Sequence, residues 1–130
     1  MNSLLWVLQV FLASHTAAGA LWKWSHSAGQ TMPSLGAIPH SVWLALSALE
    51  FLSVVGLIGP AFSKRLTISA PLAAVFIIVE MLLFSGVHLA SGSTDIGPVM
   101  YWLVVIAVCA FIVYGRLVRS PSRRSEFAYP

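Results

Sequence analysis

The sequence predicts an all-α integral membrane protein, a four-helix bundle whose two termini both lie in the cytoplasm. Of the 130 residues, 58% are hydrophobic and only 8% are charged, and the mean hydropathy is +0.89. A soluble domain carries roughly a quarter charged residues to keep its surface hydrated. Lipid is therefore the expected solvent for most of this chain. The lengths of the apolar segments and the positions of the cations specify the topology.

Four apolar segments are long enough to cross a bilayer, since about 20 residues of α-helix span about 30 Å of hydrocarbon. We place these segments at about residues 3–21, 41–59, 68–90 and 98–118. Helices are favoured because unpaired backbone groups are too costly in lipid and the sequence has no alternating barrel pattern. We expect a transmembrane domain over residues 1–118, followed by a basic cytoplasmic tail over residues 119–130.

The first segment also carries the small residues of a signal-peptide cleavage site, from Ala17 to Ala20. A signal peptide begins with a cationic stretch, and no lysine or arginine precedes Leu4. The apolar run is also long for a signal-peptide core. We therefore expect this segment to be retained as the first membrane helix.

The lysines and arginines set the orientation. With four spans, one side of the membrane holds Lys64, Arg65, Arg116, Arg119, Arg123 and Arg124, whereas the other holds only Lys23. The positive-inside rule then places both termini in the cytoplasm. This placement also accounts for the basic isoelectric point near 9.5 without any nucleic-acid partner. The aromatic residues expected to form a belt at the outer interface are Trp22, Trp24, Trp43, Tyr101 and Trp102.

The connection between residues 23 and 40 is long for so small a protein, and it lies on the outer side. A loop of this length suggests either a lid or a contact surface. A disordered tether is an equally acceptable interpretation of its length alone. The sequence leaves these alternatives open.

Ionisable side chains inside the spans are the candidate site. His15, Glu50, Glu80 and His88 fall within apolar segments, where a charge costs about 2.5–3.5 kcal/mol on insertion scales. Such residues face the bundle interior and commonly have a function. The first and third helices run outward and the second runs inward, so all four side chains share the outer half of the bundle. With Lys23 at the outer end of the first helix, we expect them to form a ligand-binding or proton site beneath the long connection.

A structural role is the alternative, because a pair such as Glu–His or Glu–Lys can hold two membrane helices together without a ligand. We favour that role for His15 and a functional role for Glu50, while Glu80 and His88 are balanced between the two. A metal site is not expected, because the Glu-x-x-His spacing of di-iron bundles is missing from the sequence. The single cysteine, Cys109, excludes a thiol pair and lies in an apolar stretch.

The order of several short motifs resembles the DoxX-like family of small bacterial four-helix membrane proteins. These motifs run from Gly19 and Lys23 through Pro39, Glu50, Gly56-Leu57, Pro60, Pro71-Leu72-Ala73-Ala74 and His88 to Tyr114-Gly115-Arg116. The resemblance covers nearly the whole chain, from about Leu4 to Arg116. It implies that Glu50 corresponds to the buried acid of the family and that His88 corresponds to its histidine on the third helix. The family is functionally mixed, and includes membrane subunits that couple an oxidation to the quinone pool.

Three functions remain in competition. The first is an accessory subunit of a membrane redox system that binds a quinone as its only, non-covalent cofactor; such a chain need not be an enzyme on its own. The second is a scaffold that assembles another membrane complex, through a membrane protein partner or as a homo-oligomer. The third is a small proton-linked transporter using Glu50 and Glu80, which we rank last because no broken helix or inverted repeat stands out.

Overall fold

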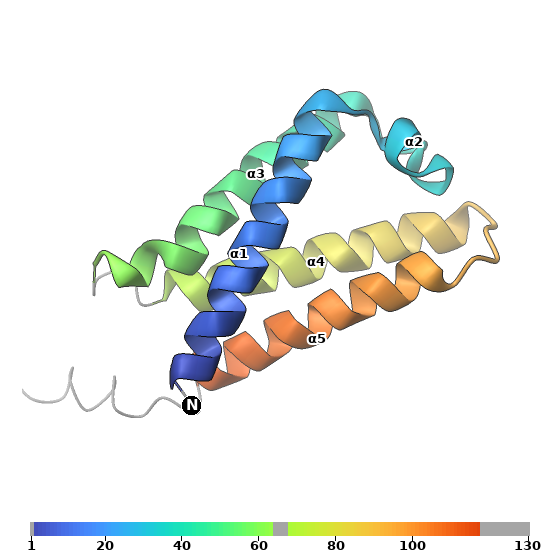
Figure 1. Ribbon diagram of the computed structural model, residues 1–130. Coiled ribbons are helices and arrows are strands. Elements are labelled where there is room, and N and C mark those ends of the chain that lie inside the picture. Colours follow the sequence, from blue (N-terminus) through green and yellow to red (C-terminus); the bar gives the residue numbers. More distant parts are fainter. Residues whose placement is uncertain (1, 64–67, 118–130) are drawn as a thin grey trace, which may run out of the picture.

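The computed structural model describes residues 2–63 and 68–117, and over these residues the chain is helical with no strand. Four long helices dominate it (Figure 1): α1 (Asn2–Ser25), α3 (His40–Ile58), α4 (Ser69–Ala90) and α5 (Gly97–Leu117). Each is long and apolar enough to cross a membrane. The prediction of four candidate spans is therefore confirmed. Lys64, Arg65, Val118 and the predicted tail lie outside the described residues.

The observed helix ends differ from the predicted ones mainly in α1. This helix continues to Ser25, beyond the predicted end at residue 21, so that Lys23 lies on the helix itself. The second apolar helix, α3, ends at Ile58, and the short 3₁₀ turn η2 (Gly59–Ala61) follows it. Proline at the start of that turn fits because its missing N–H is not needed there.

The long helices pack as two pairs. The contacts of α1 with α3, and of α4 with α5, are far more extensive than those between α1 and α5. Close approach depends on small residues. A side-chain carbon added at Gly56 on α3 would lie 3.1 Å from the Cβ of Ala73 on α4, as is common where membrane helices approach closely. Figure 1 shows α1 and α5 meeting near the N-terminus of α1 and diverging toward the other end.

The end of the bundle where α1 and α5 meet is closed by packing, and we call it the closed end. A Cβ at Gly115 would lie 2.5 Å from a methyl carbon of the fully buried Leu5, so only glycine lets α1 and α5 approach this closely. In the same region Gln9 Nε2 donates a 2.8 Å hydrogen bond to the carbonyl of Leu57. The Arg116 Nε donates to Gln9 Oε1, and its guanidinium lies over the ring of Trp6.

The connection between α1 and α3 folds over the opposite end of the bundle, and we call residues 26–39 the lid. It contains the short helix α2 (Ala28–Thr31) and the 3₁₀ turn η1 (Pro33–Leu35). Ser27 and Gln30 form a capping box at the start of α2, which fixes the local fold. Ala28, Leu35 and Ile38 are buried in the core cluster. The lid is therefore packed on the bundle, and the disordered tether is not the conformation observed.

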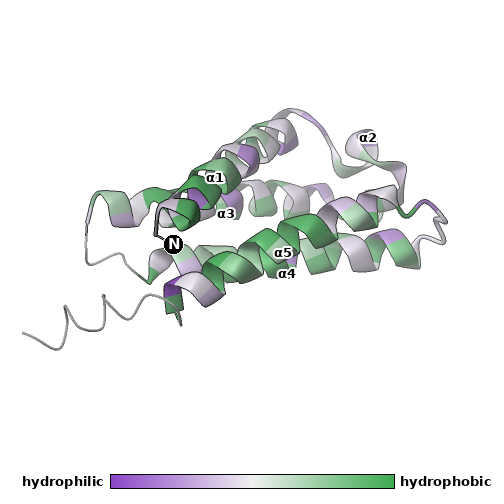
Figure 2. Cartoon of the chain, turned by 60° about the horizontal axis from the view of Figure 1, so that its bottom comes forward, coloured by the Kyte–Doolittle hydropathy of each residue, from purple (hydrophilic) through white to green (hydrophobic). Residues whose placement is uncertain are grey.

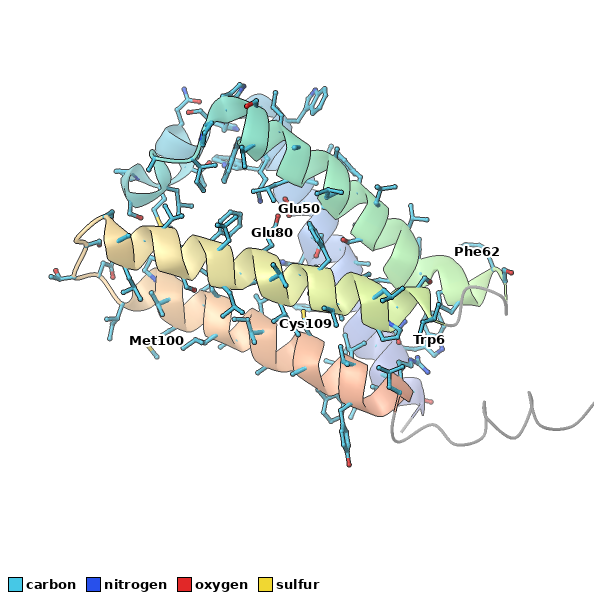
Figure 3. The ribbon with its side chains drawn as sticks, turned by 180° about the vertical axis from the view of Figure 1, so that it is seen from behind. Trp6, Glu50, Phe62, Glu80, Met100 and Cys109 are labelled. Atoms are coloured by element: carbon cyan, nitrogen blue, oxygen red, sulfur yellow. The ribbon has the colours of Figure 1, made fainter. Side chains whose placement is uncertain are left out.

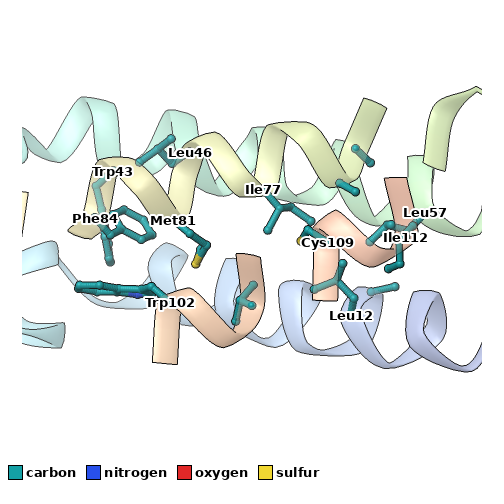
Figure 4. Packing of buried hydrophobic residues seen from close by; sticks show 14 of the residues in the cluster. Leu12, Trp43, Leu46, Leu57, Ile77, Met81, Phe84, Trp102, Cys109 and Ile112 are labelled. Atoms are coloured by element: carbon teal, nitrogen blue, oxygen red, sulfur yellow. The ribbon is translucent and has the colours of Figure 1, made fainter. Parts of the chain in front are cut away.

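The surface of the long helices suits lipid. Figure 2 shows mostly hydrophobic colours along these helices and hydrophilic colours in the lid and in the connection between α4 and α5. Large apolar side chains are exposed on every long helix, among them Phe11 at 70%, Leu52 at 66% and Val104 at 63%. In water such a surface would be a severe aggregation hazard. Inside the bundle, Figure 4 shows a continuous apolar core running from Leu57 and Ile112 to Trp43 and Trp102.

Two members of the predicted aromatic belt do not face lipid. Trp43 is 1% exposed and Trp102 is 4% exposed, whereas Trp24 is 68% exposed. Phe84 lies between Trp43 and Trp102, with ring centroids 5.9 Å from each (Figure 4). The belt prediction was therefore wrong for Trp43 and Trp102. Their helix faces point into the bundle, where the lid end leaves room for large rings.

Candidate functional site

A cavity of about 590 Å³ lies under the lid between the two helix pairs. We call it the main cavity. All four long helices contribute to its lining, and Met32 and Leu35 of the lid cover it. The side chains predicted from the sequence to converge are largely there: His15, Lys23, Glu50 and Glu80 all line it. His88 does not.

Lys23 and Glu50 form the central ion pair of the main cavity. Lys23 Nζ lies 2.9 Å from Glu50 Oε1, and both side chains are buried. The ammonium group also lies 4.9 Å from the ring centre of Trp43 and 5.2 Å from that of Phe84. Aromatic faces attract a cation at such distances. Lys23 therefore has a complete set of partners, a carboxylate and two rings, before any ligand enters.

Gly19 explains how that pair fits between α1 and α3. A Cβ at Gly19 would lie 3.6 Å from Glu50 Oε2 and 3.9 Å from Lys23 Nζ. These are ordinary van der Waals distances, but a larger side chain would project into the main cavity that Gly19 lines. One turn away, the hydroxyl of Ser47 donates a 2.9 Å hydrogen bond to the carbonyl of Ala20. The helix α3 is thereby held against α1 at the depth of Glu50.

Glu80 is the unusual member of the site. It is 2% exposed, and no donor among the described residues gives a hydrogen bond to either of its carboxylate oxygens. Its neighbour is the carboxyl group of Glu50, which lies within hydrogen-bonding reach. Figure 3 shows Glu50 and Glu80 directed toward each other from α3 and α4. Two carboxylates this close in an apolar surrounding repel each other unless a proton or a positive charge lies between them.

The rim of the main cavity is formed by α1 and α5. The exposed lining residues on these helices are Ala18, Trp22, Gly97 and Tyr101. Across this rim the hydroxyl of Tyr101 makes a hydrogen-bond contact with Nε2 of His15. The cavity thus opens sideways between α1 and α5, which pack against each other much less than α1 packs on α3 or α4 on α5, and the His15–Tyr101 contact bridges the opening. This gives His15 a partner on another helix, as its predicted structural role requires.

His88 joins the lid to the bundle. Its Nε2 lies 2.6 Å from the carbonyl oxygen of Asp95, and its Nδ1 lies 2.5 Å from the hydroxyl of Ser34 in the lid. A carbonyl only accepts, so Nε2 carries a hydrogen, and in the neutral ring Nδ1 accepts from Ser34. His88 lines a separate, shallower cavity of about 510 Å³ together with Ser34 and Asp95. Both of its nitrogens are therefore occupied outside the main cavity.

The lid has further attachments to the helices around it. Trp22 stacks on His26 with 3.6 Å between ring centroids, and its indole N–H donates a 2.8 Å hydrogen bond to Thr31. The indole N–H of Trp43 donates a 2.7 Å hydrogen bond to the carbonyl of His26. These contacts hold the lid over the part of the main cavity that is lined by Trp22 and Trp43.

Several residues of the site were missed in the sequence. Tyr101 and Trp102 were assigned only to the lipid interface, although both line the main cavity. Ser34 looked like an ordinary loop serine. Gln9 is fully buried yet was overlooked because only ionisable groups were examined. A search for every polar side chain within the apolar segments would have found Gln9, whereas nothing in the local sequence indicates Ser34.

Comparison with known proteins adds no relative to this description. No family model matches the chain, and neither do the curated proteins or the solved structures compared with it.

Proposed function

We propose that this chain is a DoxX-like multi-pass protein of the bacterial cytoplasmic membrane, with both termini in the cytoplasm. In this proposal it is an accessory subunit of a membrane redox system, and it holds a quinone-like lipophile in the main cavity. The observation that carries the proposal is the main cavity itself. It is enclosed by four apolar helices, walled by aromatic rings, and contains a buried group of one lysine and two glutamates.

The character of the cavity favours a flat, lipophilic ring with polar substituents. Ligand sites are mostly apolar, with a few polar groups that fix the orientation of the ligand. Trp43, Phe84 and Trp102 supply the apolar faces, while Lys23, Glu50 and Glu80 supply the polar groups. The opening between α1 and α5 faces the side of the bundle, where lipid would surround a spanning protein. A ligand dissolved in the membrane therefore has a direct route to the cavity.

The orientation rests on the sequence. Six lysines and arginines fall on the side that carries both termini, against Lys23 alone on the other. Lys23 itself is buried against Glu50, so the outer side has no exposed lysine or arginine among the described residues. A single cysteine introduced at Ala37 of the lid should react with a membrane-impermeant maleimide added to intact spheroplasts. Labelling only after the cells are opened would reverse the orientation.

The ligand is tested by purification in a gentle detergent, followed by mass spectrometry of the bound small molecules and proteins. We expect a stoichiometric quinone-like lipophile with the wild-type protein. Glu50→Gln should lose it, because the ion pair that shapes the polar side of the cavity is broken. Gly19→Val should also lose it, because the valine side chain occupies cavity space next to the ion pair. Ser53→Ala is the matched control, since Ser53 is buried on the same helix but does not line the cavity.

A scaffold is the second candidate, and the closed end favours it. There Gln9 and Arg116 show that this bundle also uses buried polar groups to join helices. A stoichiometric protein partner with no small molecule in the purified sample would select this function. Retention of the lipophile by both cavity variants would also count against the quinone site.

A further inference from the structure

The main cavity has stronger unused hydrogen-bond acceptors than unused donors. Lys23 is engaged by Glu50, Trp43 and Phe84, and the Tyr101 hydroxyl is engaged by His15. Among the described residues the carboxyl group of Glu50 is the one polar partner within hydrogen-bonding reach of Glu80, so at least one Glu80 oxygen is left without a hydrogen bond. The strongest polar groups left for a ligand are therefore acceptors.

Two weaker donors do not reverse this balance. Thr16 and Trp102 also line the cavity, with a hydroxyl and an indole N–H. A hydroxyl both donates and accepts, so Thr16 fits either kind of ligand group. A proton shared between Glu50 and Glu80 occupies one Glu80 oxygen, and the other oxygen is left to accept a hydrogen bond. One indole N–H therefore stands against this stronger acceptor. An unpaired buried acceptor costs roughly 1–3 kcal/mol, and a ligand that donates to it recovers that cost.

We infer that the main cavity selects the reduced, hydroxyl-bearing form of its ring ligand, a quinol, over the corresponding quinone, and that Glu80 accepts the hydrogen bond of a quinol hydroxyl. This inference rests on the proposed function. A quinone presents only carbonyl oxygens. These are hydrogen-bond acceptors, so they cannot bond to an acceptor oxygen of Glu80. A quinol presents hydroxyl groups, which donate to Glu80 while Trp43, Phe84 and Trp102 pack on the ring. The selectivity is one of binding, and it requires no electron transfer within this chain.

The test compares two forms of one probe. A benzoquinone with a decyl tail and its quinol, kept under argon, are equilibrated with the detergent-solubilised full-length protein. The bound fraction is then measured by chromatography. We expect the quinol to bind at least about tenfold more tightly, as one hydrogen bond to a buried acceptor of this kind would give. This comparison within the wild-type protein does not depend on how well any variant folds.

The Glu80→Gln variant gives a second, more specific test of the selectivity. Its amide group is close in size to the carboxyl group but can donate to a quinone carbonyl. The preference for the quinol should fall about tenfold or reverse, whereas a purely structural Glu80 would weaken both forms equally. Ser53→Ala should keep the wild-type preference. The fold of each variant is checked by size-exclusion chromatography and circular dichroism.

The outcomes separate this inference from the proposed function. If the quinone binds as tightly as the quinol, the selectivity is wrong and the quinone-like site stands. If both forms bind weakly or not at all, the proposed function fails together with the inference. Binding of a decyl-chain primary amine in place of both ring forms would identify the occupant near Glu80 as a cation, and would overturn both.

Discussion

At its closed end the bundle buries Gln9 against Arg116 and against the carbonyl of Leu57. At the lid end it buries Lys23, Glu50 and Glu80 around about 590 Å³ of space. Both groups are polar and buried within apolar helices. At the closed end the polar groups bond one another, whereas at the lid end a carboxyl group is left over beside a cavity. The difference separates polar residues whose hydrogen bonds join helices from polar residues for which we propose a ligand.

The apolar packing also differs between the two ends, because it fills the space at the closed end and leaves a cavity at the lid end. At the closed end, Gly115 lets Leu5 fill the space between α1 and α5. At the lid end, Gly19 lies next to the ion pair but leaves the cavity unfilled. Small residues therefore allow close helix contact at one end and leave cavity space at the other.

The largest effect is expected when the ion pair of the lid end is broken. Lys23→Met leaves Glu50 and Glu80 buried without a cation, and should lower the free energy of unfolding by about 3–5 kcal/mol. Adding Glu50→Gln should recover part of this loss, because one of the two buried carboxyl groups is replaced by a neutral amide that can donate to Glu80. Both are measured by titrating SDS into mixed micelles and following helix content. A loss below about 1 kcal/mol would mean that water entering from the rim already hydrates the pair.

The helices and the group around Glu50 were predictable because both follow from the cost of polarity in lipid. Apolar length identifies spans, and an ionisable side chain within a span has to turn inward. The same reasoning brought His15, Lys23, Glu50 and Glu80 to one end of the bundle, which is where the structure places them.

The contacts of individual side chains were not predictable in this way. His88 is diverted to Ser34 and Asp95 by the fold of the lid, which no helical periodicity describes. Trp43 and Trp102 could not be told from interface tryptophans, because facing lipid and facing a cavity differ by a rotation of the helix. Residues of the lid and of helix faces depend on long-range packing that spacing along the chain does not encode.

A smaller effect is expected at the closed end. Gln9→Leu removes the donor to the Leu57 carbonyl and the acceptor for Arg116 Nε. The loss should be about 1–3 kcal/mol in the same SDS titration. Ligand binding should not change, because Gln9 does not line the main cavity. Weakened binding at unchanged stability would contradict the separation of the two ends, since it would mean that Gln9 at the closed end contributes to ligand binding.

The smallest effect is expected from the lid. Ser34→Ala removes the hydroxyl that joins the lid to Nδ1 of His88, a local hydrogen bond worth about 0.5–1.5 kcal/mol. The lid keeps its contacts through Trp22 and Trp43, so global stability should hardly change. Amide hydrogens of residues 28–38 should exchange about two- to tenfold faster by mass spectrometry, while those of α3 stay as in the wild type.

Thr31→Val serves as the comparison for Ser34→Ala, because it removes a lid hydrogen bond to Trp22 on α1 instead of the one to α4. Faster exchange in both variants would mean that the lid opens as one unit over the main cavity. Faster exchange only near the substituted residue would mean that each attachment holds its own segment. In that case ligands would enter between α1 and α5 without any opening of the lid, and the His15–Tyr101 contact would be the barrier they meet.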